Sequence, residues 1–531
     1  MENRKSAPES SRGASLVRHG STLSALTLVS RVLGLVREMV KAALLGTTAL
    51  SDAFTVAFMI PNLLRRLFAE GSIAVAFIPT FKGYLIEEDK EKTKEFLSAT
   101  FTFLSFFVTV AVLIGVAAAP LVVPIFGIKE FDETVFLTRI MFPYLACVSV
   151  AAFFQGILNT VHVFAPTGFA PILLNIVTIG AALLLSPFTA NPARAMAVGV
   201  ILGGLLEALV QLPFVLSRGF RFPLISLKRA FTNPGTRTVL RLIGPTIVGM
   251  AAYQLNDLVS TALAGNAGAG VVSSLQYSLR LQELILGVFA VSIGTVLLPD
   301  LAGHAKSGRW DEYNDRLVTA MDIIALITIP ITFFALVQGE LLVRLLFQAR
   351  SFDENSVRLT TTAFMFHIPG LFFIALNRIL APAFYAQSDS KSPTMAGIAS
   401  FAVNMALAAL FVGPLRGGGV ALALTVASAV NTVLLVAFLA RNPKVAVGRA
   451  VRSASVYALR LALISVAAAA PLVFLGGRIA APFAGRGRLV SYGFPLAIST
   501  LLYAAVGIGL LALTKDEQAK AVVRAFRRRG K

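Results

Sequence analysis

Long apolar stretches recur along almost the whole chain, and they constrain its fold more than any other feature. A helix needs about 20 apolar residues to cross a hydrocarbon core of about 30 Å, and about fourteen stretches are long enough. They are predicted near residues 22–46, 52–82, 95–126, 133–161, 167–187, 194–217, 236–264, 270–302, 316–348, 356–386, 392–413, 417–440, 453–476 and 489–514. With 56% hydrophobic residues, 14% charged residues and a mean hydropathy of +0.78, the chain is predicted to be an all-α polytopic membrane protein.

The polar residues exclude several classes of function. The only cysteine, Cys147, cannot form an internal disulfide, and the four histidines are scattered rather than placed at metal-ligand spacing. A net charge of +20 would suit nucleic acid, but the basic residues lie in short segments between apolar stretches, where they report membrane orientation. We therefore expect no metal ion, no nucleic-acid partner and no catalytic residues.

Basic residues concentrate in alternate loops, which predicts the orientation of the chain. Lysine and arginine are retained on the cytoplasmic side of a membrane protein. Here they collect in the segments 4–18, 82–95, 217–241, 304–316, 441–452 and 515–531. Most of the intervening loops carry little charge, so both termini are predicted to be cytoplasmic.

Prolines in the apolar stretches indicate an internal duplication. Pro79, Pro143 and Pro166 are matched by Pro299, Pro369 and Pro393 at offsets of 220 to 227 residues. An even number of helices separates the two copies, so both would cross in the same direction and be related by an axis along the membrane normal. The alternative is chance, because proline is common in membrane helices.

The duplication predicts a domain organisation with two lobes and two additional helices. The predicted parts are a disordered basic tail (1–20), a first lobe (21–217), a basic linker (218–235), a second lobe (236–440), two C-terminal helices (441–514) and a basic tail (515–531).

Arginines inside the apolar stretches are the strongest indication of function. Arg31 and Arg37 lie in the first stretch, Arg65 in the second and Arg280 in the eighth. An arginine near the bilayer centre costs roughly 2.5–3.5 kcal/mol on insertion scales. Such residues usually face a hydrated cavity and bind an anion or a carboxylate, which favours a membrane protein that handles anions.

Acidic residues near these arginines leave two interpretations open. Glu38, Asp52, Glu70 and Glu283 can support or neutralise the cations, and the alternative is a set of ion pairs that only joins helices. With Lys41 and Arg66 included, the six cations of the three stretches exceed these four anions by about two charges, which a diphosphate would balance. We therefore expect Arg31, Arg37, Arg65 and Arg280 to bind a substrate.

Several motifs resemble the MurJ (MviN) family of lipid II flippases. They include SRVLGLVRE, SDAF, PNLLRRLFAEGS, LLPDL and LAPAFYAQSDSKSPT. The resemblance implies the fold of the multidrug/oligosaccharidyl-lipid/polysaccharide exporter superfamily, with about 14 helices in two pseudo-symmetric lobes of about six plus two that accommodate a polyprenyl tail. It places the family's cavity arginines on Arg31, Arg37, Arg65 and Arg280. Some members bind sodium in the second lobe, which implies Asp257, Asn404 and Thr425 here, although Ala408 replaces an expected carboxylate.

The resemblance implies a flippase that moves lipid II to the outer leaflet by alternating access. It further implies a monomer with membrane lipids and cell-wall synthesis proteins as partners, driven by the membrane potential or Na⁺. The alternatives are an exporter of another polyprenyl-linked glycan or amphiphile, and a membrane enzyme acting on polyprenyl phosphates. The enzyme would need an acidic metal-binding cluster or a histidine nucleophile in a loop, and the sequence has neither pattern.

Overall fold

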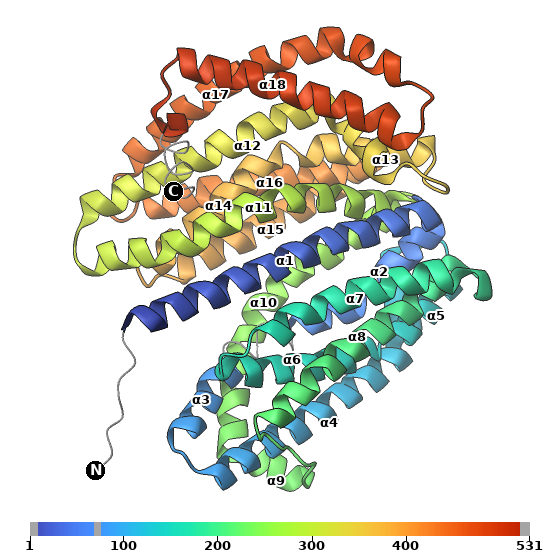
Figure 1. Ribbon diagram of the computed structural model, residues 1–531, viewed down its shortest axis with the longest axis vertical. Helices are drawn as coiled ribbons and strands as arrows, with labels where there is room; N and C mark the ends of the chain where they lie inside the picture. Colours follow the sequence, from blue (N-terminus) through green and yellow to red (C-terminus); the bar gives the residue numbers. More distant parts are fainter. Residues whose placement is uncertain (1–8, 68–75, 521–531) are drawn as a thin grey trace. The chain divides into compact units, whose positions relative to one another are not determined.

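Every described element of secondary structure is a helix. The computed structural model describes residues 9–67 and 76–520, with side chains described outside 9–24, 245–253 and 287–296. The helices divide into two compact units, Met1–Leu255 and Asn256–Lys531 (Figure 1). The predicted all-α fold is therefore confirmed.

The described part of the first unit contains ten α-helices, the last of which continues into the second unit. They are α1 (Glu9–Leu45), α2 (Ala49–Arg65), α3 (Ile78–Ile86), α4 (Lys90–Val122), α5 (Phe131–Met141), α6 (Tyr144–Thr160), α7 (Ala165–Leu184), α8 (Pro192–Ser217), α9 (Leu227–Thr232) and α10 (Pro234–Asn266). Because α1 begins at Glu9, residues 9–20 of the segment predicted to be a disordered tail are helical.

A buried aromatic cluster joins the helices of the first unit. The Phe77 ring lies 5.5 Å from Phe81, 5.8 Å from Phe96 and 5.1 Å from Phe153, measured between centroids. These rings come from α3 and its preceding turn, α4 and α6, and all four residues are at most 2% exposed. Offset and tilted ring pairs of this kind add to the free energy gained from burial, so the cluster fixes α3 against α4 and α6.

The segment predicted to link the lobes packs against the first unit. The Ile225 amide donates to Thr102 Oγ1 at 3.0 Å, and Thr236 Oγ1 lies 3.3 Å from Thr100 Oγ1, both on α4. Val239 is buried in the same apolar cluster as Phe96. The start of α10 therefore belongs to the first unit, and the boundary between units falls inside this helix at Leu255 rather than in residues 218–235.

The second unit contains the remaining helices. They are α11 (Val271–Lys306), α12 (Trp310–Phe347), α13 (Glu354–His367), α14 (Gly370–Tyr385), α15 (Lys391–Leu415), α16 (Gly417–Leu439), α17 (Val447–Ala480) and α18 (Phe494–Leu513). Within this unit α17 and α18 lie along α12 (Figure 1), where the Tyr503 hydroxyl donates to the Pro330 carbonyl at 2.8 Å.

One predicted pair of repeated prolines occupies equivalent positions in the two units. Pro143 stands between α5 and α6, and Pro369 stands between α13 and α14, where the two helices meet at 47°. Proline has no amide hydrogen to donate and its ring clashes with the preceding turn, so it interrupts a helix at both places. This equivalence supports the duplication over a chance recurrence of prolines.

Side-chain hydrogen bonds tie α12 to α14 and to the loop after α16. The Tyr313 hydroxyl donates to the Ala383 carbonyl at 2.7 Å, and Gln387 Nε2 donates back to that hydroxyl at 2.8 Å. Asn442 Nδ2 then donates to Gln387 Oε1 at 2.7 Å. Because these polar atoms satisfy one another, the ends of the three segments are held together without an ion pair.

Nine described helical segments are long and apolar enough to cross a membrane, and ten if the bent pair α13–α14 counts as one span. The four predicted stretches outside this set lie on α1, α2 with α3, α10 and α11. Three of these stretches include residues 68–75, 245–253 or 287–296, which lie outside the part of the chain whose side chains are described. The expected number of about fourteen spans stays a prediction.

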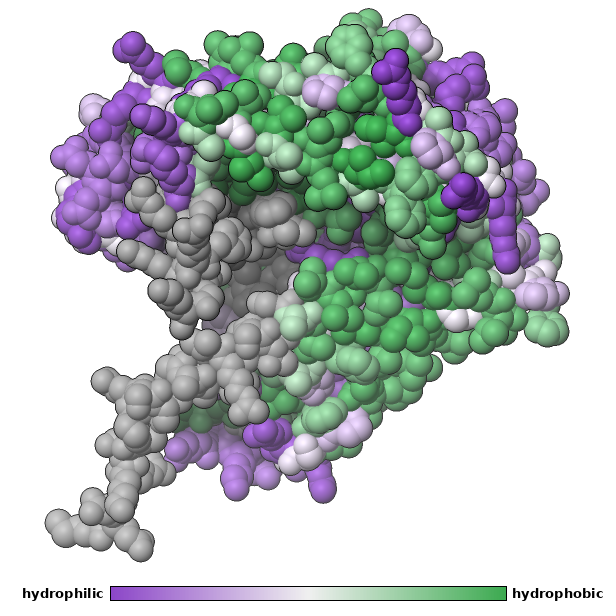
Figure 2. Space-filling view, turned by 45° about the horizontal axis from the view of Figure 1, so that its top comes forward, coloured by the Kyte–Doolittle hydropathy of each residue, from purple (hydrophilic) through white to green (hydrophobic). Residues whose placement is uncertain are grey.

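The outer surface of the helices carries large apolar side chains. On the face drawn in Figure 2, hydrophobic residues cover broad areas of each unit, and hydrophilic residues gather in separate areas. Phe188, Phe474 and Leu513 are exposed by 85%, 81% and 79%. A contiguous apolar surface of this extent suits contact with lipid acyl chains and not with water.

Candidate functional site: charged clusters in the two units

The charged residues at the end of α1 form a cluster with the start of α2. Arg37 Nη2 lies 3.0 Å from Glu38 Oε1, and Lys41 Nζ lies 4.0 Å from Glu38 Oε2. Lys41 also donates to Thr55 Oγ1 of α2 at 2.7 Å. Glu38 and Lys41 are 8% and 4% exposed, so this carboxylate is buried with two cations against it. Arg31 and Glu38 are seven residues apart, a spacing that places both on one face of the helix, but the structure pairs Glu38 with Arg37.

Aromatic rings of α2 cover the two cations of this cluster. The Arg37 guanidinium carbon lies 5.9 Å from the Phe58 ring centroid, and Lys41 Nζ lies 5.8 Å from that of Phe54. Phe54 and Phe58 are themselves stacked, at 6.3 Å. A cation over a ring face is stabilised by the ring quadrupole, so α2 offsets part of the desolvation cost of Arg37 and Lys41.

Arg31 is placed differently from Arg37. It is exposed, and no ion pair or hydrogen bond of its side chain is found among the described residues. It lies about 9 Å before Arg37 along the helix axis. A guanidinium with five donors and no carboxylate beside it is available to an anion that approaches this face of α1.

Arg65, at the end of α2, borders a cavity of about 320 Å³ inside the first unit. Its Nε donates to Asn62 Oδ1 at 2.8 Å. The cavity is also lined by polar residues of α6, α7 and α8: Gln155, Asn159, Thr167, Glu207 and Gln211. Gln211 is 2% exposed and its Oε1 atom has no hydrogen-bond partner among the described residues, so a polar occupant would be stabilised there.

Asp52 and Glu70 are the two other acidic residues of the first unit that were predicted to support the arginines. Asp52 is 2% exposed in the first turn of α2, where an acidic residue complements the positive end of the helix dipole. The hydroxyl of Thr48, and not the Asp52 carboxylate, caps this helix by accepting from the Ser51 amide at 3.3 Å. Glu70 lies outside the described residues.

In the second unit, Arg280 forms the predicted pair with Glu283. Arg280 Nη1 lies 3.0 Å from Glu283 Oε2, one turn along α11. The two side chains are 42% and 55% exposed. An exposed pair at this spacing contributes little stability, at most about 1 kcal/mol, so an anion can compete with Glu283 for the guanidinium.

Comparison with known proteins decides the family. The family model described as "Lipid II flippase MurJ" matches residues 41–481. A "Probable lipid II flippase MurJ" of Treponema pallidum is 46% identical over 520 residues, which cover 97% of this chain and 99% of that protein. This chain belongs to the MurJ lipid II flippase family. It is therefore a membrane transporter and not an enzyme.

Further relatives and solved structures agree with membership of the MurJ family. The "Lipid II flippase MurJ" of Burkholderia cenocepacia is 35% identical over 424 residues, covering 78% of this chain and 82% of that one. The structure of a lipid II flippase MurJ in an inward closed conformation has the same fold, with a TM-score of 0.75 at 22% identity, over 93% of this chain and 98% of that chain. An inward-facing MATE transporter of the MOP superfamily reaches 0.67 at 13% identity, over 81% and 98%. The superfamily fold expected from the motifs is confirmed.

The residues implied for a sodium site in this MurJ family member engage other groups. Thr425 Oγ1 donates to the Phe366 carbonyl at 2.7 Å, and Asn404 Nδ2 donates to Asn256 Oδ1 at 2.8 Å. Asn404 is 1% exposed, and within the described part of the chain its Oδ1 atom has no hydrogen-bond partner, so one oxygen could face a cation. Asp257 and Asn256 are adjacent on α10. A metal cation of this kind is held by several oxygen ligands, and only one available oxygen is identified here. Sodium binding therefore stays a prediction.

The polar residues that line the cavity beside Arg65 were not among the binding residues predicted from the sequence. Gln155 and Asn159 are four residues apart on α6, and Glu207 and Gln211 are four apart on α8. Such pairs share a helix face, so polar residues at this spacing inside apolar stretches were the available signal. Their convergence on Arg65 depends on packing between helices, which the spacing does not give.

Proposed function

We propose that this protein moves lipid II from the cytoplasmic to the outer leaflet of the bacterial inner membrane. The family and the names of its relatives support this cargo. The observation that carries the proposal is Arg31, an exposed guanidinium in a helix of the first unit with no ion pair among the described residues. An uncompensated guanidinium in an apolar helix costs free energy, and binding an anionic ligand would offset that cost.

The arginines are proposed to bind the diphosphate of the cargo. Arg31 and Arg37 would contact different phosphate oxygens, because they are about 9 Å apart along the helix axis. Glu38 keeps the Arg37 side chain oriented at 3.0 Å but is also bonded to Lys41, so Arg37 retains donors for a ligand. Arg65 would add a binding group in the first unit and Arg280 one in the second, and the protein would expose its binding groups to either side of the membrane in turn by alternating access.

The two C-terminal helices are proposed to accommodate the polyprenyl tail. Along α17, Val473 and Phe474 are 64% and 81% exposed, and along α18, Leu501 and Ile508 are 71% and 66% exposed. A hydrocarbon chain lying against these side chains would stay in an apolar environment while its headgroup crosses.

Transport of labelled lipid II in vesicles that contain only this protein is the direct test. We expect labelled headgroups to become accessible on the opposite leaflet, and an analogue without the diphosphate to remain where it was added. In cells, depletion should leave lipid II on the cytoplasmic leaflet. Transport of other polyprenyl-linked glycans but not of lipid II would replace the proposed cargo by the alternative exporter function.

The membrane potential is proposed as a driving force. Moving about two negative charges outward across 100 mV, inside negative, releases roughly 4.6 kcal/mol, and the same field favours the return of an empty cationic cavity. We expect collapse of the potential in reconstituted vesicles to slow lipid II transport several-fold, measured with matched K⁺ and valinomycin. Unchanged transport after collapse would exclude this driving force. Replacing Na⁺ by choline in the same vesicles tests the sodium alternative separately.

The proposed function also includes a membrane orientation, an oligomeric state and partners. We propose that both termini are cytoplasmic, since the basic segments alternate along the chain. We propose that the protein acts as a monomer in contact with membrane lipids and with cell-wall synthesis proteins.

A further inference from the structure

The cavity beside Arg65 is small enough to limit the size of its occupant. It has a volume of about 320 Å³ and is lined by residues of α2, α3, α6, α7 and α8, all in the first unit. Pockets that hold small ligands range from about 300 to 1,000 Å³, and this cavity lies at the lower end of that range. It therefore has room for a single ring and not for a longer chain of rings.

The charges in the wall of this cavity oppose each other. Among the described residues that line it, Arg65 carries a positive charge and Glu207 a negative charge. Glu207 is 6% exposed, so little water screens its carboxylate. An anion inside the cavity would be repelled by Glu207, and a cation by Arg65. The lining therefore favours a neutral ligand.

Side-chain amides supply both hydrogen-bond donors and acceptors to the cavity. Asn159 Oδ1 accepts from Thr167 Oγ1 at 3.2 Å, and no hydrogen bond from Asn159 Nδ2 is found among the described residues. Gln211 Nε2 donates to the Glu207 carbonyl at 2.9 Å, whereas its Oε1 atom has no partner in the described part of the chain. The Gln155 side chain is exposed, and its amide has no hydrogen bond to a described residue. Asn159 thus offers a donor, Gln211 an acceptor and Gln155 both.

This combination matches hydroxyl and amide groups and not phosphate. An ionised phosphate oxygen only accepts hydrogen bonds, so it cannot satisfy Gln211 Oε1. A hydroxyl group donates and accepts, and an acetamido group has an N–H and a carbonyl. Because Gln211 is 2% exposed, an acceptor left unsatisfied there costs free energy that a donating ligand would recover. A sugar ring with hydroxyl and acetamido groups meets all these requirements.

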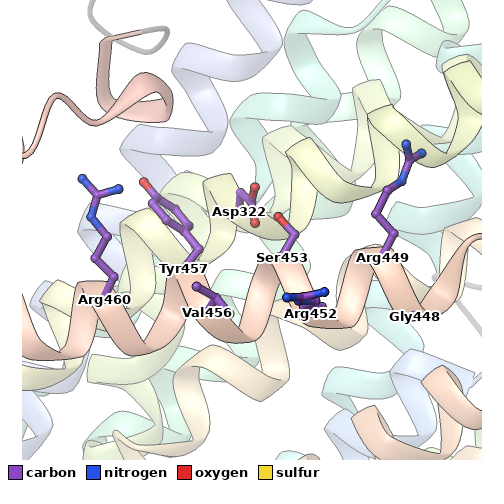
Figure 3. A pocket seen from close by; sticks show the side chains of 8 residues that line it. All are labelled: Asp322, Gly448, Arg449, Arg452, Ser453, Val456, Tyr457 and Arg460. Carbon is purple, nitrogen blue, oxygen red and sulfur yellow. The ribbon is translucent and has the colours of Figure 1, made fainter.

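A groove along the start of α17 in the second unit has a different lining. Figure 3 shows Arg449 and Arg460 extending from α17 at its two ends, with Arg452 between them and Asp322 behind. Side-chain amides are absent from the described residues that line this groove. Of these two spaces, the cavity beside Arg65 is therefore the one suited to a neutral, hydroxylated ligand.

We propose that the cavity beside Arg65 binds the first sugar of the cargo, the N-acetylated ring bonded directly to the diphosphate. This sugar site rests on the proposed function, from which the cargo is taken. A diphosphate held by Arg65 outside the cavity brings the ring next to it, because a single oxygen joins ring and phosphate. Gln211 accepts from a hydroxyl or N–H group of the ring, and Gln155 and Asn159 donate to its oxygens. These three amides then determine specificity for a glycan over a bare polyprenyl diphosphate.

The test compares two ligands that differ by one ring. Undecaprenyl diphosphate, with and without one N-acetylhexosamine, is titrated against the purified full-length protein in native mass spectrometry. For Gln211→Met we expect about tenfold weaker binding of the sugar-bearing ligand and less than about twofold change for the bare diphosphate. Gln338→Met is the matched control and should change neither, because Gln338 is 3% exposed on α12 and does not line the cavity. Equal weakening of both ligands by Gln211→Met, or of neither, would overturn the proposal.

A second variant keeps the test decisive if Gln211→Met does not fold, which size-exclusion chromatography shows. Gln155→Met removes an exposed amide without a partner among the described residues, so folding should be unaffected. We expect about threefold weaker binding of the sugar-bearing ligand, and unchanged binding would contradict the sugar site.

The parent protein separates failure of the sugar site from failure of the proposed function. We expect it to bind the sugar-bearing ligand more tightly than the bare diphosphate. Equal binding of the two ligands would exclude the sugar site and leave recognition of the diphosphate by the arginines intact. Binding of neither ligand would overturn the proposed function and the sugar site together.

Discussion

Replacing Arg31 by alanine is expected to reduce lipid II transport by about 10- to 100-fold, the loss that follows when a charge-assisted contact to phosphate is removed. Stability should be almost unchanged, because Arg31 is exposed and no partner among the described residues is left unpaired. Transport is measured in reconstituted vesicles, and stability by the thermal unfolding midpoint in detergent.

Two comparisons make the Arg31 prediction specific. Arg31→Lys keeps the charge but loses the planar fork, so it should retain an intermediate rate. Arg358→Ala is the matched control, since Arg358 is exposed on α13 and contacts only Asn355, at 2.9 Å, among the described residues. Full transport by Arg31→Ala would remove Arg31 from the binding site. Arg37→Ala is less informative, because it also leaves the buried Glu38 without its closest cation.

Replacing Gly199 by alanine is expected to lower the free energy of unfolding by about 2 kcal/mol, because the new methyl group has no space between α7 and α8. A Cβ atom at Gly199 would lie 2.7 Å from Ala181 Cβ and 2.9 Å from Thr178 Cα. Neither atom can rotate away, so the helices must separate. Gly199 and Gly203 are four residues apart, the spacing at which small residues let membrane helices approach closely.

Gly180→Ala is the control for this substitution. Gly180 lies on α7, and nothing lies within 4 Å of the position where its Cβ would be. Alanine there should leave the protein as stable or slightly more stable, since it is the better helix former. The readouts are the amount of monodisperse protein on size-exclusion chromatography and the midpoint of thermal unfolding. Equal behaviour of the two variants would show that α7 and α8 are not held at this distance by the glycine.

Local sequence signals predicted the helical fold well. Apolar stretches of sufficient length predicted the helices, and the recurrent prolines indicated a duplication. The breaks between α5 and α6 and between α13 and α14, inside stretches that were predicted to be continuous, agree with that duplication. These signals are reliable because backbone polar groups in a membrane must be satisfied inside each helix. The boundary between the units was less predictable. It lies within α10, because Thr236 and Val239 pack on α4, and packing partners distant in sequence leave no local pattern.

The candidate site was predictable in its residue types and less so in its contacts. Arg280 and Glu283 pair as their spacing indicates, since both lie on one helix. Glu38 pairs with Arg37 and Lys41 instead of Arg31, and Lys41 reaches Thr55 of α2, a contact across helices. The cavity beside Arg65 joins α6, α7 and α8, so its polar lining depends on how these helices cross.

By itself the sequence determined that this chain is helical, that it belongs in a bilayer and that it carries guanidinium groups for an anion, because length, hydropathy and residue chemistry are properties of single segments. The tertiary structure alone decided which cations are neutralised and which are available. Arg37 is paired with Glu38, whereas Arg31 is exposed and has no ion pair among the described residues. The physical reason is that Coulomb attraction and desolvation depend on distances between side chains of different helices, and only packing sets those distances.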